Sequence, residues 1–136
     1  FPLVFVSLRE KGAKDWQSGL GISTSIIGRQ HKIQYHHIFP KALVKGNYDQ
    51  SIVNEIANLA FISGRTNQRI GKKEPKEYIK EILEQQGAQA LTKQGMPTEM
   101  SFYELGNFES FLQERRRLLA DIVNNFLAGL SVEGEV

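Results

Sequence analysis

The sequence predicts an α+β fold: a mostly helical domain arranged around a small two-stranded antiparallel hairpin. Two short segments rich in apolar and β-branched residues, 32–38 and 59–63, indicate the two strands. A helix signal follows the second segment directly, which gives the order strand, connection, strand, helix. In the second half of the chain, apolar residues recur at helical spacing. We therefore expect one domain over residues 1–136, with a ββα core at about 31–74 and a helical part at 75–130.

Helix, loop and strand signals follow one another in the first part of the chain. Leu3–Lys11 comes directly after Pro2 and predicts a helix, although its β-branched content leaves a strand open. Residues 12–28 are rich in glycine and serine and predict a loop that Trp16 anchors in the core. Lys32–Ile38 alternates between apolar and polar residues, as a half-buried strand does.

The next segments complete the predicted ββα unit. Pro40 ends the first strand and opens a short helix over Lys41–Lys45. Asp49–Asn58 predicts a helical turn, and Leu59–Ser63 predicts the second strand. Thr66 is the expected N-cap of the helix that follows.

Proline, glycine and asparagine mark the ends of the remaining helices. Pro75 opens a helix that Gly87 ends, and a shorter helix is expected over Ala88–Gln94. Asn107 is the candidate N-cap of the last helix. The apolar stripe of that helix is expected to consist of Phe108, Phe111, Leu112, Leu118, Leu119, Ile122, Val123, Phe126 and Leu127.

The composition limits the kinds of site that the chain can hold. Hydrophobic residues make up 40% and charged residues 24%, which is typical of a globular protein. There is no cysteine, so a metal must be held by histidine, asparagine, carboxylates or water, and a reducing cytoplasm is the expected location. No stretch approaches the roughly 18 apolar residues of a membrane span. Because the chain starts on apolar residues without methionine, we expect it to be a fragment of a larger protein.

The adjacent histidines His36 and His37 are the sharpest local feature. Neighbouring side chains on a strand point to opposite faces unless the backbone bends where the strand ends, and Pro40 marks such an end. One imidazole can then be a metal ligand while the other acts as a base toward a water molecule. The alternative is a pair of ordinary histidines, one buried and one exposed.

Two asparagines, Asn58 and Asn67, lie on either side of the second predicted strand. An amide oxygen can bind a hard cation, and the amide N–H groups can orient a neighbouring group. We expect Asn67 to direct its oxygen toward a metal held by His36, and Asn58 to hydrogen-bond to the backbone or ring of His37. The alternative roles are a turn residue and a cap residue.

Together these residues resemble the signature of the HNH, or His-Me finger, endonucleases, in which a ββα unit holds one divalent ion. The order is His-His-x-x-Pro, then Asn-Leu before a short apolar strand, then Asn after the turn. The segments Ile-Ala-Asn-Leu-Ala-Phe-Ile-Ser and Arg-Thr-Asn-Gln-Arg-Ile-Gly further resemble the C-terminal nuclease domain of GmrSD-type modification-dependent restriction proteins. The resemblance implies that His36 and Asn67 are metal ligands, His37 is the general base, and Asn58 braces the loop and His37.

The resemblance also implies the reaction and its setting: metal-dependent DNA cleavage in a bacterial restriction or anti-phage defence protein, next to an N-terminal NTP-hydrolysing, ParB-like domain. Many HNH domains have aspartate where this chain has His36. Mg²⁺ or Mn²⁺ is the expected ion, with Ni²⁺ or Zn²⁺ as alternatives because imidazole is a softer ligand than a carboxylate.

Basic residues are concentrated around these positions. Residues 29–80 hold ten basic and four acidic side chains, whereas the rest of the chain holds seven basic and eleven acidic ones. This predicts a polyanionic partner, DNA, with a merely solvated surface as the alternative. The candidates for phosphate contact are Lys41, Arg65, Arg69, Lys72 and Lys73. A second hypothesis is a DNA-binding docking or regulatory module with an inactive metal site.

Overall fold

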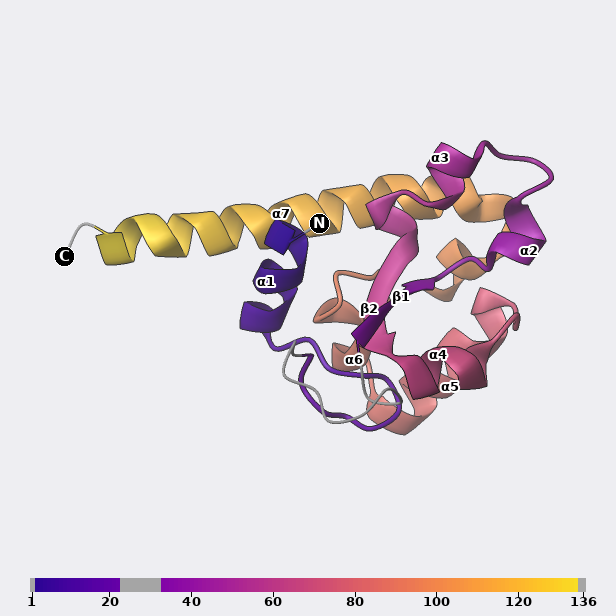
Figure 1. Ribbon diagram of the computed structural model, residues 1–136, viewed down its shortest axis with the longest axis horizontal. Coiled ribbons are helices and arrows are strands. Elements are labelled where there is room, and N and C mark those ends of the chain that lie inside the picture. The colour runs from indigo at the N-terminus through magenta and orange to yellow at the C-terminus, as the bar shows by residue number, and fades with distance from the viewer. Residues whose placement is uncertain (1, 23–32, 135–136) are drawn as a thin grey trace.

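The computed structural model describes residues 2–22 and 33–134, with side chains described as far as residue 130. It is mostly helical with a two-stranded antiparallel sheet, which confirms the predicted α+β class (Figure 1). The strands are β1 (Ile33–His37) and β2 (Leu59–Ser63). The α-helices are α1 (Pro2–Lys11), α2 (Lys41–Val44), α3 (Gln50–Val53), α4 (Gly64–Ile70), α5 (Pro75–Gln86), α6 (Gln89–Thr92) and α7 (Phe108–Gly134). Short 3₁₀ helices are η2 (Ile56–Asn58), η3 (Met100–Tyr103) and η4 (Leu105–Asn107).

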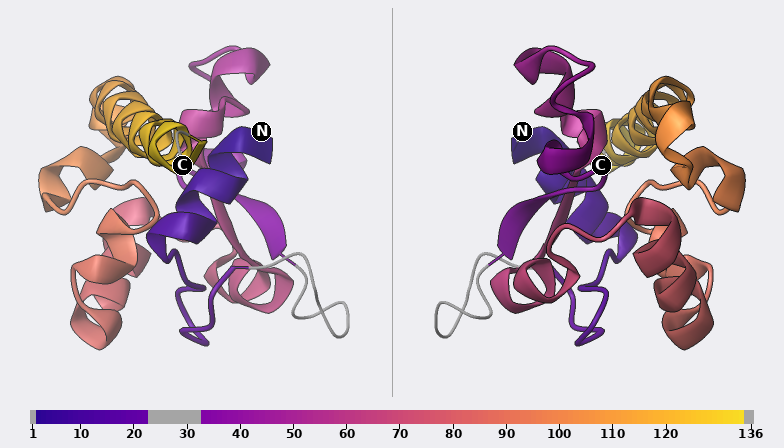
Figure 2. Two further views of the ribbon diagram at one scale, coloured as in Figure 1. Left: turned by 90° about the vertical axis from the view of Figure 1, so that its left-hand side faces the viewer. Right: turned by 90° about the vertical axis from the view of Figure 1, so that its right-hand side faces the viewer.

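The two strands pair in one register that sets the directions of the histidines. His36 lies opposite Ala60, and His37 lies opposite Leu59. Every residue of β2 is buried, whereas Gln34 and Tyr35 on β1 are exposed, so β1 is the outer strand. Figures 1 and 2 show η2 at one end of the strands and α4 at the other. The sheet thus lies between η2, which carries Asn58, and α4, which carries Asn67.

The core forms where α7 and the segment after β1 pack together. The Phe39 ring lies 4.8 Å from that of Phe108 and 5.0 Å from that of Phe111, measured between centroids. Tyr78 and Ile79 of α5 are buried in the same cluster. These large apolar side chains hold the end of β1 against the helices.

Helix α7 extends beyond the body of the molecule, as Figure 1 shows. Its predicted apolar stripe is buried at Leu119 and Ile122 and half-buried at Val123 and Phe126. Leu127 is 43% exposed, so the expectation that it belongs to the core stripe is wrong. The helical spacing continues past the point where α1 and the strands provide a surface to pack against.

The beginning of α4 is set by a buried carboxylate that the sequence did not single out. Asp15 accepts hydrogen bonds from the Ser63 backbone N–H at 2.8 Å and the Thr66 hydroxyl at 2.8 Å. The Ser63 hydroxyl in turn accepts the Thr66 backbone N–H, so Ser63 is the N-cap of α4 and the prediction of Thr66 is wrong. Thr66 lies in the first turn of α4, where its hydroxyl donates to Asp15.

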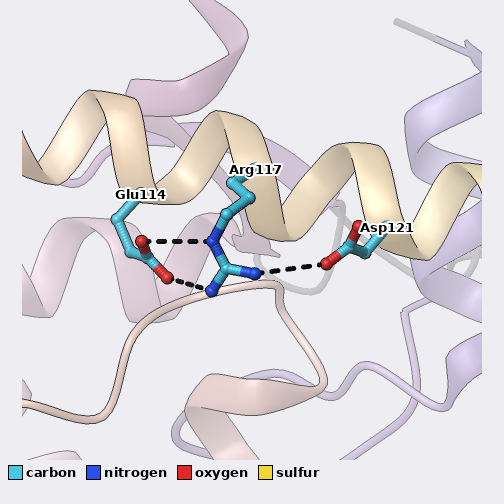
Figure 3. A network of polar contacts seen from close by, with 3 residues as sticks. All are labelled: Glu114, Arg117 and Asp121. Carbon is cyan, nitrogen blue, oxygen red and sulfur yellow. Dashed lines mark hydrogen bonds and ion pairs between the residues drawn. The ribbon is translucent and has the colours of Figure 1, made fainter.

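The arginine run at 115–117 divides among three environments. Arg117 pairs with Glu114 and Asp121 on the same helix (Figure 3), and Arg116 pairs with Glu55. Arg115 is fully buried and donates to backbone carbonyls, at 3.0 Å each, of Ala57, Leu59 and Gln94. Burial lowers the pKa of Arg115 to about 10, which still leaves it positively charged at neutral pH. Arg115 thus ties α7 to both ends of the η2–β2 junction.

The remaining expectations differ from the structure mainly at element ends. The predicted strand at Lys32 and the predicted loop at 23–28 lie outside the described residues. The helix expected over Ala88–Gln94 is shorter, and η3 and η4 were not predicted. Asn107 directly precedes α7, but its side-chain amide donates to the Ser101 carbonyl. Within the described residues, no helix has the length and apolar character needed to cross a membrane.

We predict that Asp15→Asn lowers the free energy of unfolding at neutral pH by about 2 kcal/mol, because several buried donors lose a charged acceptor. Burial alone would raise the pKa of Asp15, but hydrogen bonds from Ser18, Ser63 and Thr66 outweigh it and hold the pKa below its ordinary 3.8. The stabilisation is therefore present above that value and is lost as the pH falls below it. Denaturant unfolding from neutral to strongly acid pH measures this.

The matched control is Glu84→Gln, which neutralises an exposed carboxylate on α5 and should change the stability by less than about 0.5 kcal/mol. A difference between wild type and Asp15→Asn that persists undiminished in strong acid would contradict the role of the carboxylate charge.

Candidate metal and nucleic-acid site

Four elements bring the candidate residues to one region of the fold. Strand β1 carries His36 and His37 at its end, and α4 carries Asn67 one turn after its Ser63 cap. Asn54 follows α3 as its C-cap, and α5 presents Tyr78 from its buried face. The two histidines share β1, and each of the other three side chains is held by a separate piece of backbone.

The His36 imidazole is buried and contacted at both ring nitrogens. Nδ1 lies 2.8 Å from Oδ1 of Asn67, and Nε2 lies 3.2 Å from the Tyr78 hydroxyl oxygen. The rings of Trp16 and Tyr78 pack edge-on against it, at centroid distances of 5.9 and 5.4 Å. This enclosure leaves only 2% of His36 exposed.

Burial lowers the pKa of His36 to about 4, despite the opposing effect of its bond with Asn67, and the charge of His37 lowers it further. At neutral pH the ring is therefore uncharged and has one nitrogen lone pair available. A neutral imidazole is the form that binds a metal ion.

The spacing of His36 and Asn67 fits two ligands of one divalent ion. Bonds of roughly 2.1 Å at a right angle place two donor atoms roughly 3 Å apart. The 2.8 Å between Nδ1 of His36 and Oδ1 of Asn67 is close to this value, and in the ion-free chain it is the distance of an ordinary hydrogen bond. Within residues 2–22 and 33–130, no group of three or more histidine or acidic side chains is arranged to hold a metal ion. The candidate donor set is therefore one nitrogen and one amide oxygen.

His37 is half-buried and has a different partner, Asn54. Its Nε2 lies 2.8 Å from Oδ1 of Asn54. Because an amide oxygen can only accept, Nε2 of His37 must donate. A neutral His37 then carries its lone pair on Nδ1, the nitrogen available to take a proton. Asn54 was not predicted, since an asparagine after a short helical turn carries no signal of its own.

Asn58 holds the backbone that follows His37. Its Oδ1 accepts the Phe39 N–H at 2.8 Å, and its Nδ2 donates to the carbonyls of Phe39 at 3.2 Å and Val53 at 2.9 Å. Its own carbonyl accepts the Ile38 N–H at 2.8 Å. Asn58 is fully buried and braces the loop through the backbone, whereas the ring of His37 is held by Asn54.

The five basic candidates, Lys41, Arg65, Arg69, Lys72 and Lys73, are all exposed. Arg65 and Arg69 lie four residues apart on α4 and share one face, whereas Asn67 lies about 200° around the helix axis from each. Arg69 and Lys73 also line a cavity of about 130 Å³ together with Trp16 and Tyr78. The arginines of α4 therefore do not converge with Asn67 on a single point.

Comparison with known proteins gives one partial match. A stretch of 64 residues, 46% of this chain, is 33% identical to an uncharacterized protein of Methanocaldococcus jannaschii and covers 11% of it. The chain thus spans about a tenth of the length of that relative. No protein-family model and no solved structure matches the chain.

Proposed function

We propose that this chain is a metal-dependent DNA endonuclease of the HNH type that hydrolyses phosphodiester bonds. The observation that carries the proposal is the 2.8 Å separation of Nδ1 of His36 and Oδ1 of Asn67, next to a second imidazole with its own partner. The resemblance of the His-His-x-x-Pro and asparagine pattern to HNH nucleases supports the same assignment.

His36 and Asn67 would hold one divalent ion, whose other positions are left for water and phosphate oxygens. When bound, such an ion neutralises charge on the phosphate and on the leaving oxygen. The imidazole ligand favours Mn²⁺, Ni²⁺ or Zn²⁺ over Mg²⁺. Burial of His36 keeps this ligand neutral and excludes bulk water from its ring.

His37 would activate the attacking water. Its Nδ1 takes one proton as the water oxygen bonds to phosphorus, and the bond from phosphorus to the 3′ oxygen breaks. The leaving oxygen takes up a proton from solvent, so the products are a 5′-phosphate and a 3′-hydroxyl. Asn54 keeps Nε2 of His37 engaged, which orients the ring and stabilises the imidazolium that forms.

The basic side chains would contact phosphates beside the scissile one. Because Arg65 and Arg69 stand away from Asn67 on α4, they would meet neighbouring nucleotides. Lys41, Lys72 and Lys73 would extend the same contact. In the parent protein, an N-terminal NTPase or ParB-like domain would select the DNA, in keeping with restriction or anti-phage defence in the cytoplasm.

A second candidate function is a DNA-binding docking or regulatory module with an inactive metal site. The near-complete burial of His36 and the lack of a third histidine or acidic ligand within the described residues favour it. Such a module would bind DNA with the same salt dependence but would cleave it with no metal.

Alanine substitution of His36 and of His37 should affect different properties, metal binding and cleavage. We expect His36→Ala to weaken Mn²⁺ binding by about 100-fold or more, since even residues outside the ligand shell are typically worth roughly 10–100-fold. His37→Ala should keep Mn²⁺ bound while plasmid nicking falls roughly 10²–10⁴-fold, the value of a general base. Electron paramagnetic resonance of free Mn²⁺ and nicking of supercoiled plasmid measure the two effects. Nicking by His37→Ala at the wild-type rate would rule out His37 as the base.

Asn54 should act as a positioning residue for His37. We expect Asn54→Ala to lower the nicking rate about 10-fold to 100-fold through loss of ring orientation. Asn54→Asp should recover most of the rate, because a carboxylate also accepts from Nε2. Asn47→Ala, which removes an exposed asparagine before α3, is the control and should leave the rate unchanged. Equal losses in the alanine and aspartate variants would contradict the positioning role.

The basic side chains should determine the salt dependence of DNA binding. Arg65→Ala and Lys72→Ala should each reduce the slope of log affinity against log salt by about 1, as expected for one phosphate contact. Arg9→Ala removes an exposed arginine from α1 and should leave the slope unchanged. Fluorescence anisotropy in chelator separates this binding from cleavage. An unaltered slope in both Arg65→Ala and Lys72→Ala would show that neither side chain contacts a DNA phosphate.

A further inference from the structure

The cavity of about 130 Å³ beside Trp16 lies between α4, α5 and the loop that precedes β1. Its inner wall consists mainly of buried apolar and aromatic side chains, those of Trp16, Ile70, Tyr78 and Ile82. Exposed polar side chains form its mouth: Gln17, Arg69, Lys73, Glu81 and Gln85. An apolar interior with a few polar groups at the opening is the usual construction of a site for a small molecule or for one part of a larger one.

The charged groups at the mouth are divided between two sides. Arg69 lies on α4 and Lys73 just after it, whereas Glu81 lies on α5. Within the part of the chain that the structure describes, no ion pair joins Glu81 to either cation. The carboxylate and the two cations can therefore contact different parts of one bound molecule.

The volume and the charges together restrict the ligand. Pockets for drug-sized ligands typically hold roughly 300–1,000 Å³, so a cavity of about 130 Å³ admits only a small, flat group. A phosphate is small enough, but the carboxylate of Glu81 at the mouth would repel it. A nucleobase is flat and uncharged, and its edge carries both donors and acceptors.

The polar groups at the mouth also distinguish between bases. A carboxylate can only accept, so Glu81 favours a base edge with an amino group, as in adenine and cytosine, over thymine, which presents a carbonyl oxygen there. With its amide rotated, Gln17 accepts from Arg69 through its oxygen, which leaves its N–H groups for a ring acceptor. The amide of Gln85 can donate in the same way.

We propose that this cavity binds one unpaired nucleobase with an amino group, adenine or cytosine, while Arg69 and Lys73 contact the phosphate of the same nucleotide. That the nucleotide belongs to DNA rests on the proposed function. A base can enter such a cavity only from a single strand or after leaving the duplex stack. Because the rings of Trp16 and Tyr78 pack on His36 and also line the cavity, the base would share these two neighbours with the candidate metal ligand.

Trp16 is the only tryptophan of the chain, so its fluorescence reports on the cavity that it lines. The full chain would be titrated, in chelator, with dAMP, dCMP, dTMP and deoxyribose 5-phosphate, which has no base. We expect dAMP and dCMP to change the Trp16 emission and dTMP to bind about 10-fold more weakly. Deoxyribose 5-phosphate should leave the emission unchanged. Chemical shifts of the side-chain amides of Gln17 and Gln85 measure the same binding independently.

Glu81→Gln tests the source of the base preference. An amide both donates and accepts, so this variant should bind dCMP several-fold more weakly and dTMP more tightly, and the roughly 10-fold preference should disappear. Glu84→Gln is the matched control, because it removes the same charge from an exposed position on α5 that does not line the cavity. It should keep the preference of the wild type.

Equal binding of the three nucleotides and of deoxyribose 5-phosphate would show an anion site only and would overturn the base pocket. Trp16 emission and amide shifts that no ligand changes would also overturn it, and loss of the preference in Glu84→Gln would overturn the role of Glu81. The titrations need neither a metal ion nor cleavage. Base binding by a chain that never cleaves DNA would therefore contradict the proposed endonuclease and support the pocket, whereas cleavage without base binding would do the reverse.

Discussion

Two strands of five residues each must be held in one register if His36 and His37 are to face in different directions. A two-stranded sheet is at best marginally stable by itself in water. Besides the apolar packing of Phe39 against α7, buried polar side chains hold the two ends of the sheet. Asn58 bonds to the backbone just after β1, and Arg115 bonds to carbonyls on both sides of the start of β2. Asp15 fixes the other end of β2 to α4.

Burying the polar side chains of Asn58, Arg115 and Asp15 is costly unless they form hydrogen bonds, and each of them has several partners. An unpartnered buried charge or amide destabilises a fold strongly, whereas a fully bonded one specifies a single arrangement. The carboxylate of Asp15 receives donors from its own loop, from β2 and from α4. The candidate site therefore stands on backbone whose position is defined at both ends of the sheet.

The two adjacent histidines lie in different surroundings on this frame. His36 is enclosed by Trp16 and Tyr78, and burial lowers its pKa to about 4. His37 remains half-buried, with Asn54 at one ring nitrogen. Under the proposed function, the first environment is that of the metal ligand and the second is that of the general base. Adjacent positions in the sequence thus occupy chemically different surroundings.

The sequence predicts the parts of the structure that depend on local pattern. The β-branched segments around His36 and Phe61 form the two strands, and Pro75 and Gly87 mark the ends of α5. Residues whose role depends on distant contacts could not be predicted. Asp15 bonds across 48 residues to Ser63, and Tyr78 across 40 to Ile38, so neither had a local signal.

Two further differences between prediction and structure also arise from distant contacts. Asn54 and Arg115 are ordinary surface residue types that became important because tertiary packing gave them ring and carbonyl partners. Leu127 keeps the helical spacing of the apolar stripe but is 43% exposed. Pattern indicates which face of a helix is apolar, but not how far along the helix a partner surface extends.

The proposed function requires that Nδ1 of His36 and Oδ1 of Asn67 hold one divalent ion. Anomalous diffraction from crystals soaked in Mn²⁺ tests it most directly. The account predicts one anomalous peak within about 2.3 Å of both atoms. Manganese bound elsewhere on the chain, with the two atoms still in direct contact at 2.8 Å, would contradict it.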